Sequence, residues 1–408
     1  MAAVFPGSRC PGGKASARLP HAGARIVAIS GSVVAAGVLA ALPAGAASAD
    51  RASAADRAVL GAPAGSAGID GFLIGVAASS ARNAWAVGHT GSVCHPRPLV
   101  LHWSGSGWRR VPSPSPRGGS LEGVAVTSAR SAWAVGYVGG LKQQTLLLRW
   151  NGAVWSRVSS PAPARGSLIG VSATSARHAW AVGVTGGGKT LILRWNGIAW
   201  KRVPSPSPAG FDILVGVTAT SARNAWAVGS AGNRVLILHW NGTAWRRVRS
   251  PNPVRGGVIF GIAAISARNA WAVGQTGNLA NTRPGTLILH WNGTTWRRVP
   301  GPAAGVASLE GIAMTSARSA WAVGQTGPPD VVSCVSTGSR AAVPANRTLI
   351  LHWNGRAWNR VAAPSPAGGA GLINVAATSA RSAWAVGFAG PFGKAKTLTM
   401  RWNGSAWK

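Results

Sequence analysis

The chain has 408 residues, with 41 Lys and Arg against 7 Asp and Glu, so its formal net charge at pH 7 is +34. One Tyr and three Cys exclude catalytic sites that need several tyrosines and metal sites that need clustered cysteines. So positive a field attracts polyanions such as nucleic acid, anionic wall polymers, acidic glycans and membrane surfaces, although a merely solvated basic surface is the simpler interpretation.

Residues 1–49 have the pattern of a secretory signal. A basic lead precedes an apolar, Ala- and Val-rich stretch at 26–42, and small residues at 44–46 or 47–49 offer a cleavage site. The apolar stretch, about 17 residues, is short for a membrane span. We therefore predict a mature chain that is secreted or wall-associated and has no membrane span. In that oxidising setting Cys94 and Cys334 are candidates for a disulfide.

The 21 tryptophans fall into seven copies of one repeat, three in each copy. The first tryptophan of each copy lies in an Ala-Trp-Ala-Val-Gly run: Trp85, Trp133, Trp180, Trp226, Trp271, Trp321 and Trp384. The other two bracket a short turn: Trp103/Trp108, Trp150/Trp155, Trp195/Trp200, Trp240/Trp245, Trp291/Trp296, Trp353/Trp358 and Trp402/Trp407. A period of roughly 45–63 residues that is rich in strand signals indicates a radial or stacked array.

The fourth copy shows how one repeat folds. Its short apolar or alternating runs, at 214–220, 225–229, 236–240 and 244–248, have the length of strands. Asn241-Gly242 predicts a tight hairpin, because both positions of such a turn need positive φ. A Pro-rich exit then carries the chain to the next copy, since proline cannot continue a ladder. Each repeat is therefore predicted to be a four-stranded antiparallel meander.

Seven such meanders bury their faces when they stack around an axis, so we predict an all-β, seven-bladed β-propeller over residues 50–408. The repeats begin near residues 71, 120, 167, 213, 258, 308 and 371. The tryptophans are expected to fill the wedges between blades, the alternative being a platform on which sugars stack. Basic residues on the fourth strand would protect the outer edge of each blade from aggregation.

The last copy stops at Lys408, before its fourth strand would form, and residues 57–63 resemble the missing piece. We predict that this N-terminal strand completes the seventh blade and closes the ring. Deletion of residues 50–62 would then lower the stability sharply, whereas an unchanged melting temperature would contradict the idea.

The run Trp-Ala-Val-Gly, followed by Leu-Ile-Leu-His-Trp-Asn-Gly-Thr-Ala-Trp-Arg-Arg-Val, resembles the kelch repeat. It is equally similar to sialidase-type (BNR-like) and photosystem II assembly-factor propeller repeats, and most similar to uncharacterised, secreted, Trp-rich propellers of actinobacteria. The resemblance covers about residues 56–408. It lacks the regular double glycine of kelch and the aspartate of the sialidase box. It implies the propeller fold but no function.

Catalytic machinery is not evident in the sequence. Tyr137 stands alone, so neither a tyrosine-based copper site nor a sialidase nucleophile is supported. Glu122 and Glu310 are the best carboxylate pair, near one end of the channel but across it. One repeat position holds either His or Arg, and we interpret it as a basic surface site and not as a metal site. Its residues are His102, Arg149, Arg194, His239, His290, His352 and Arg401. We expect no cofactor and no metal.

Two features are candidates for binding. The first hairpin turn carries one arginine in every copy: Arg82, Arg130, Arg177, Arg223, Arg268, Arg318 and Arg381. Together these arginines would form a ring that binds an anionic polymer. The alternative is that each is a solvated turn residue copied with the repeat. The loop between the second and third strands is longest in blade six, where it contains Asp330 and Arg340. The loops that differ most in length belong to blades five, six, seven and one, which are neighbours in a closed ring. They either build a specific binding site or are surface insertions without a function.

These features predict a monomeric, secreted binding or scaffold module without catalysis. Its expected partner is an extracellular anionic polymer, glycan or protein, with no specific recognition of nucleic acid. The alternative is a propeller enzyme of the lyase or glycan-hydrolase type that uses the loop cluster of blades five, six, seven and one.

Overall fold

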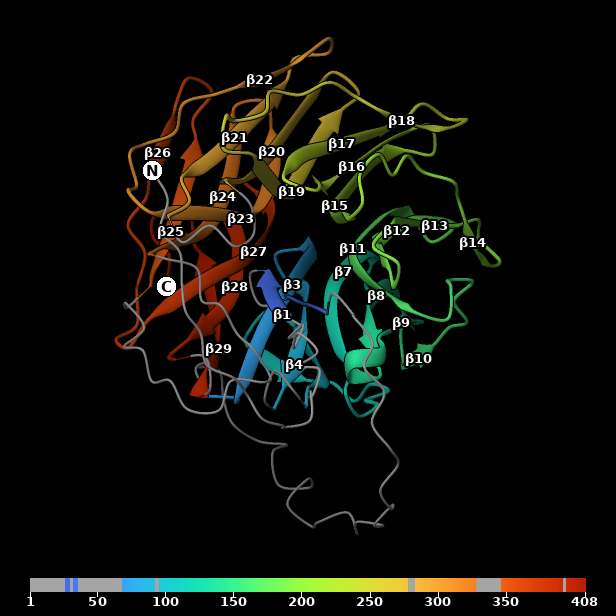
Figure 1. Cartoon of the computed structure of the whole chain (residues 1–408). Coiled ribbons are helices and arrows are strands. Elements are labelled where there is room, and N and C mark those ends of the chain that lie inside the picture. Colours follow the sequence, from blue (N-terminus) through green and yellow to red (C-terminus); the bar gives the residue numbers. More distant parts are fainter. Residues whose placement is uncertain are drawn as a thin grey trace, which may run out of the picture.

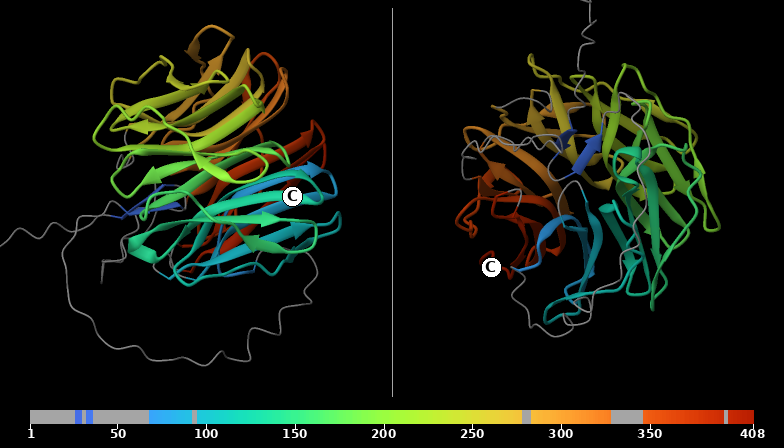
Figure 2. Two further views of the ribbon diagram at one scale, coloured as in Figure 1. Left: turned by 90° about the vertical axis from the view of Figure 1, so that its right-hand side faces the viewer. Right: turned by 60° about the horizontal axis from the view of Figure 1, so that its bottom comes forward.

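The computed structural model describes residues 26–29, 32–35, 68–91, 95–277, 283–327, 346–391 and 394–408. Seven small sheets follow one another around a central axis in chain order, which makes the molecule an all-β, seven-bladed β-propeller, as predicted (Figure 1). Figure 2 shows the ring from two further sides. A separate hairpin pairs β1 (Ile26–Ile29) with β2 (Ser32–Ala35), inside the stretch for which the sequence predicts a signal.

Each blade is an antiparallel meander whose strands we call inner, second, third and outer. Blade one contains β3 (Gly71–Ser80), β4 (Asn83–Thr90), β5 (Arg97–Trp103) and β6 (Trp108–Arg110). Blade two contains β7 (Ser120–Ser128), β8 (Ser131–Val138), β9 (Gln144–Trp150) and β10 (Trp155–Arg157). Blade three contains β11 (Gly166–Ser175), β12 (His178–Thr185), β13 (Thr190–Trp195) and β14 (Trp200–Arg202), and blade four contains β15 (Asp212–Ser221), β16 (Asn224–Ala231), β17 (Arg234–Trp240) and β18 (Trp245–Arg247). Blade five contains β19 (Gly257–Ser266), β20 (Asn269–Thr276), β21 (Thr286–Trp291) and β22 (Trp296–Arg298). Blade six contains β23 (Ala307–Ser316), β24 (Ser319–Thr326), β25 (Arg347–Trp353) and β26 (Trp358–Arg360). Blade seven contains β27 (Ala370–Ser379), β28 (Ser382–Ala389) and β29 (Lys396–Trp402). A short 3-10 turn, η2 (Gly140–Lys142), lies in the loop between β8 and β9 of the second blade.

The turn between the third and outer strands is wider than the sequence suggests. In blade four Trp240 pairs with Trp245, so four residues form the loop and not the two of a tight Asn-Gly hairpin. Gly242 has a φ of 100°, and the Asn241 side-chain oxygen accepts hydrogen bonds from the backbone N–H groups of Thr243 and Ala244. The side chain of Asn therefore supplies the local hydrogen bonds that a tighter turn would take from the backbone.

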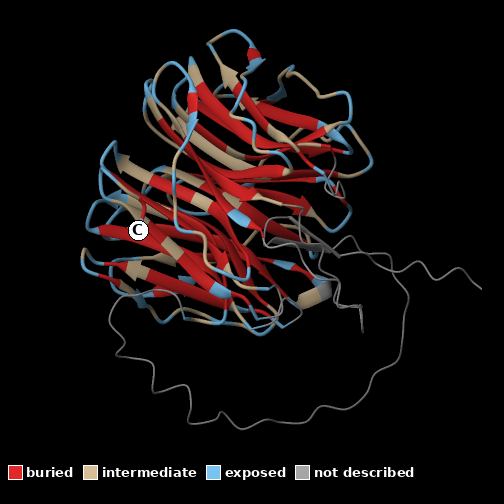
Figure 3. Ribbon diagram, turned by 90° about the vertical axis from the view of Figure 1, so that its left-hand side faces the viewer, coloured by how far each residue is buried: buried red, intermediate tan, exposed pale blue. Residues whose placement is uncertain are grey.

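The tryptophans fill the wedges between blades, as predicted. We call the one in the second strand the core tryptophan, the one at the end of the third strand the rim tryptophan, and the one that starts the outer strand the edge tryptophan. Core Trp226 of blade four packs against rim Trp291 at 5.0 Å and edge-to-face against Trp296 at 5.3 Å, both from blade five. The core tryptophans are at most 3% exposed, and each belongs to an apolar cluster between blades. Figure 3 shows how buried residues run along the strands of the blades.

The ring is closed between blade seven and blade one. The backbone N–H of Gly71 donates to the carbonyl of Ala395, and that of Thr397 donates to Ile69. Core Trp384 of blade seven lies in one apolar cluster with Trp103 of blade one.

The outer position of blade seven is taken by the chain's own last residues. Trp407 pairs with Trp402, and Lys408 exchanges two backbone hydrogen bonds with Arg401. The start of the fourth strand is therefore present, contrary to the expectation that the copy stops before it. Residues 57–63, for which we predicted this role, lie outside the described residues.

Candidate functional site

The two ends of the ring differ in what they carry. In an antiparallel meander the inner-to-second turn and the third-to-outer turn share one end of the blade, which we call the turn face. The longer second-to-third loops and the Pro-rich connections occupy the other end, the loop face.

The turn face carries one arginine of common geometry in every blade. The backbone N–H of Arg223 donates to Ser221 Oγ at 3.2 Å, and the arginine stem lies against Gly242 of the neighbouring turn, where an added Cβ would be 3.3 Å from Arg223 Cβ. All seven turn arginines are exposed: Arg82, Arg130, Arg177, Arg223, Arg268, Arg318 and Arg381. The predicted ring therefore exists, with each stem held by its own blade.

Further exposed cations lie on the outer strands: Arg109, Arg110, Arg157, Lys201, Arg202, Arg246, Arg247, Arg297, Arg298 and Arg360. The acidic residues of the described chain, Asp70, Glu122, Asp212 and Glu310, belong to the beginnings of inner strands, toward the loop face. Among the described residues the turn face thus presents many guanidinium groups and no Asp or Glu side chain. This separation produces a strongly positive face.

The position that holds either His or Arg is not a surface site, which corrects the sequence interpretation. His239 is half-buried and stacks on core Trp226 of its own blade, with ring centroids 4.2 Å apart, and its Nε2 lies 2.7 Å from Asn224 Oδ1. Burial lowers the pKa of the His239 imidazole below its usual value, which favours the neutral ring. His102, His290 and His352 stack in the same way, and burial lowers their pKa values too.

Where this position holds arginine, the side chain reaches further. The Arg194 guanidinium carbon lies 5.3 Å from the ring of its own core Trp180 and 5.5 Å from that of rim Trp240 in the next blade. Arg149 and Arg401 bridge two blades in the same manner. These cation–π contacts are structural, and they cover an indole that would otherwise face solvent.

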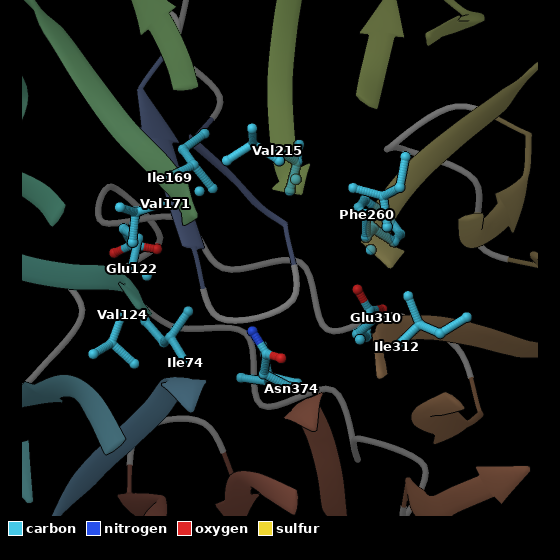
Figure 4. Close-up of a pocket in the computed structure, with 18 residues that line it drawn as sticks. Ile74, Glu122, Val124, Ile169, Val171, Val215, Phe260, Glu310, Ile312 and Asn374 are labelled. Carbon is cyan, nitrogen blue, oxygen red and sulfur yellow. The ribbon is translucent and has the colours of Figure 1, made fainter. Parts of the chain in front are cut away.

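The central channel contains a cavity of about 120 Å³ lined by all seven inner strands (Figure 4). A register shift between Leu214 and Gly216 makes Val215 a bulge residue, and Val215 lines the cavity. The following glycine lets the next inner strand approach, because a Cβ at Gly216 would lie 2.7 Å from the carbonyl oxygen of Phe260. The bulge residues of the seven blades are Ile74, Glu122, Ile169, Val215, Phe260, Glu310 and Ile373.

Glu122 and Glu310 stand on opposite walls of this cavity, as the sequence suggested (Figure 4). The walls between them are mostly apolar, with Asn374 of blade seven as a polar exception. Blades three to five contribute one cluster that includes Phe260, and blades seven and one contribute another that includes Phe72. Glu310 accepts a hydrogen bond of 2.6 Å from Ser308 Oγ.

Near Glu122 lies a polar group of His89, Ser120 and Tyr137, whose contacts the sequence did not predict. His89 Nδ1 of blade one lies 3.2 Å from Ser120 Oγ of blade two, and Ser120 also interacts with the Tyr137 hydroxyl. Burial lowers the His89 pKa to about 4, and burial together with the charge of Glu122 raises the pKa of Tyr137. The only signal available was that these positions differ from blade to blade inside an otherwise regular repeat.

Several predicted residues fall outside the described part of the chain. Asp330, Arg340 and Cys334 belong to the long blade-six loop, and Cys94 to the corresponding loop of blade one. Neither the loop site nor the disulfide is therefore assigned here. Within the described ranges no three His, Cys, Asp or Glu side chains are grouped to hold a metal ion, and no helix has the length and apolarity to cross a membrane.

No protein-family model and no curated protein matches the chain, so the likeness to kelch or BNR repeats and to actinobacterial propellers stays a prediction. Solved structures of similar fold do exist. YCF48 bound to D1 peptide has a TM-score of 0.53 at 12% identity, covering 84% of this chain and 95% of that one. YCF48 from Cyanidioschyzon merolae has a TM-score of 0.50 at 18% identity, covering 81% and 96%.

An enzyme is also similar in structure. The GH74 xyloglucanase from Xanthomonas campestris has a TM-score of 0.52 at 14% identity, covering 81% of this chain and 54% of that one. The structural neighbours thus include a protein solved with a bound peptide and a glycoside hydrolase. At such identities the likeness shows the fold alone.

Proposed function

We propose that this protein is a binding module for an extracellular anionic polymer, and that the turn face is its binding surface. The observation that supports the proposal most is the ring of seven exposed turn arginines on a face whose described residues include no Asp or Glu. Guanidinium groups form paired hydrogen bonds with carboxylate and phosphate. Identical groups in successive blades suit a ligand that repeats its own charge.

The predicted secretory signal is consistent with this proposal, because it would deliver a monomeric propeller to the outside of the cell, where anionic polymers and glycans are found. The alternative, an enzyme of the lyase or glycan-hydrolase type, has weaker support. Glu122 and Glu310 face one cavity, but its volume of about 120 Å³ is small beside the roughly 300–1,000 Å³ of ordinary ligand pockets. We therefore assign no catalytic role to the two carboxylates.

The test is to replace all seven turn arginines with Gln and to measure binding of the mature chain to polygalacturonate and to polyphosphate. The matched control replaces seven exposed outer-strand arginines with Gln: Arg109, Arg110, Arg157, Arg246, Arg247, Arg297 and Arg298. Both variants have the same net charge. We expect the turn variant to lose binding near physiological salt and the control, whose substitutions lie on the outer strands and not in the turns, to lose much less.

The salt dependence adds a second measure. The slope of log affinity against log salt should become shallower in the turn variant by roughly 0.7–0.9 for each contact removed, since each contact releases counterions. Equal losses in the two variants would mean that net charge alone attracts the polymer, and the turn face would then have no special role.

A further inference from the structure

The rim tryptophans differ in exposure from blade to blade, although their sequence context is the same. Rim tryptophans of blades one, three and four are buried: Trp103, Trp195 and Trp240. Those of blades two, five, six and seven are half-buried: Trp150, Trp291, Trp353 and Trp402. The difference in exposure among the rim tryptophans must therefore come from residues of a neighbouring blade.

The cause lies in the preceding blade, at the position that holds either His or Arg. The three buried rim tryptophans each have a guanidinium over their ring, 5.0 Å away for Trp103, 5.3 Å for Trp195 and 5.5 Å for Trp240. The four half-buried ones all follow a blade with histidine: His102, His239, His290 and His352. The shorter imidazole stacks on its own core tryptophan and leaves the next rim indole open.

The open indoles are fixed in place. Nε1 of Trp291 donates to the carbonyl of Ala267 at 3.0 Å, in the turn that carries Arg268. Trp353 and Trp402 make the same bond to the turns of Arg318 and Arg381. Each open indole is therefore hydrogen-bonded to a turn that carries an exposed arginine, and blades five, six and seven repeat this indole–guanidinium pair three times in succession.

We propose that these indole–guanidinium pairs are subsites for the sugar rings of an acidic polysaccharide, so that the anionic polymer bound by the turn face is a glycan rich in carboxylate or sulfate. This inference rests on the proposed function and adds the chemical class of the ligand. An indole face carries negative quadrupole charge, which attracts the partially positive C–H groups on one side of a sugar ring. The arginine beside it binds the acidic substituent of the same sugar.

Single-stranded nucleic acid also combines negative charge with flat rings, but the geometry fits it less well. Bases stack on aromatic side chains that offer a whole ring face. Here each open indole stays half-buried, with core and edge tryptophans against it; Trp353, for example, lies 4.8 Å from Trp271 and 5.9 Å from Trp358. A low apolar patch of this kind suits the puckered C–H surface of a sugar.

The experiment exchanges His for Arg at the repeat position that already holds either residue in different blades. The variant H239R/H290R/H352R adds three positive charges and should cover Trp291, Trp353 and Trp402 in the way that Arg194 covers Trp240. The probes are polygalacturonate, its methyl-esterified neutral form, polyphosphate and oligo-dT. Quenching of tryptophan fluorescence by acrylamide reports whether the indoles are covered, and a thermal melt reports whether the variant folds.

We expect the triple variant to bind polygalacturonate about tenfold more weakly, as the loss of roughly 0.5 kcal/mol at each of three rings would give. Binding of polyphosphate, which has no ring, should stay the same or become tighter. The reverse exchange, R149H/R194H, should open Trp195 and Trp240 and strengthen binding of polygalacturonate in spite of its lower charge.

Other outcomes separate this inference from the proposed function. Tighter binding of polygalacturonate by a triple variant whose tryptophans are shown to be covered would refute the sugar subsites, and the arginine ring would still stand. Loss of oligo-dT binding with unchanged polygalacturonate binding would show that the indoles stack on bases. Should the turn-arginine variant keep full polymer binding, the proposed function itself would fail.

Discussion

On the turn face every blade presents the same arginine in the same turn, whereas in the loop half of the channel the bulge residue varies among Ile, Val, Phe and Glu from blade to blade. Arg82 and Arg223 have one geometry, but their blades line the cavity with Ile74 and Val215, and blade two does so with Glu122. A repeated surface suits a ligand that repeats. A channel lined by different residues gives one asymmetric environment on the axis of the ring.

The core tryptophans belong to the repeated part, and removal of one should show the largest effect. Trp226→Ala leaves a cavity between blades four and five, so we expect the free energy of unfolding to fall by about 3–5 kcal/mol. The measurement is chemical denaturation, with Ile198→Ala as the control, because Ile198 is an exposed apolar residue outside the wedges. Equal losses would mean that the wedge between blades is not the main source of stability.

His89 tests the varied part. Its pKa is lowered to about 4, so between pH 6.5 and 4 the unfolded chain binds a proton that the folded chain does not, and stability falls as the pH falls. The loss should approach about 3 kcal/mol at pH 4. His89→Phe, which copies Phe388 of blade seven at the same position, should flatten this dependence in melts from pH 7 to pH 4. An unchanged profile would place the acid-sensitive group elsewhere.

The glycines that follow the bulge residues test how closely neighbouring blades must approach. In Gly170→Ala the added Cβ would lie 2.6 Å from the carbonyl oxygen of Val215, so blades three and four must move apart. We expect a loss of about 1–3 kcal/mol, as for other overpacked positions. Gly210→Ala is the control, because no atom lies within 4 Å of the added Cβ. A neutral result for Gly170→Ala would show that the channel can widen freely.

The smallest effect is expected on the turn face itself. Ser221→Ala removes the hydrogen bond from the Arg223 backbone N–H to Ser221 Oγ. The turn is exposed, so we expect a loss of about 0.5–1.5 kcal/mol in stability. Polymer binding should weaken only slightly, because Gly242 still supports the arginine stem. A large loss of binding would mean that the serine orients the guanidinium.

The fold was predictable because its signals are local and repeated. The tryptophan triplet recurs in all seven copies, and the Asn-Gly turn and the Pro-rich exit each recur in six. These signals place the strands without knowledge of the neighbouring blades, although the Asn-Gly turn proved wider than predicted. The ring of turn arginines follows from the repeat for the same reason.

The rest depends on contacts between blades, which no single repeat contains. His239 and Arg194 occupy one repeat position, yet whether a rim tryptophan is open depends on which of them lies in the blade before it. The contact of His89 with Ser120 likewise joins adjacent blades across 31 residues of sequence. Both were out of reach until the blades were placed side by side.

The joint between blade seven and blade one contains the backbone hydrogen bond that the other joints have. The bond from Gly71 to Ala395, 2.9 Å long, has counterparts such as Gly166 to Gln143 at 2.8 Å and Gly257 to Asn233 at 3.0 Å. This joint also has a bond from the Thr397 N–H to the carbonyl of Ile69, so the blades that meet there are held at least as firmly as the others. A circularly permuted chain, opened at any Pro-rich connection and tethered across the present ends, should assemble into the same propeller, and the identity of the first blade would be a matter of gene order and not of structure.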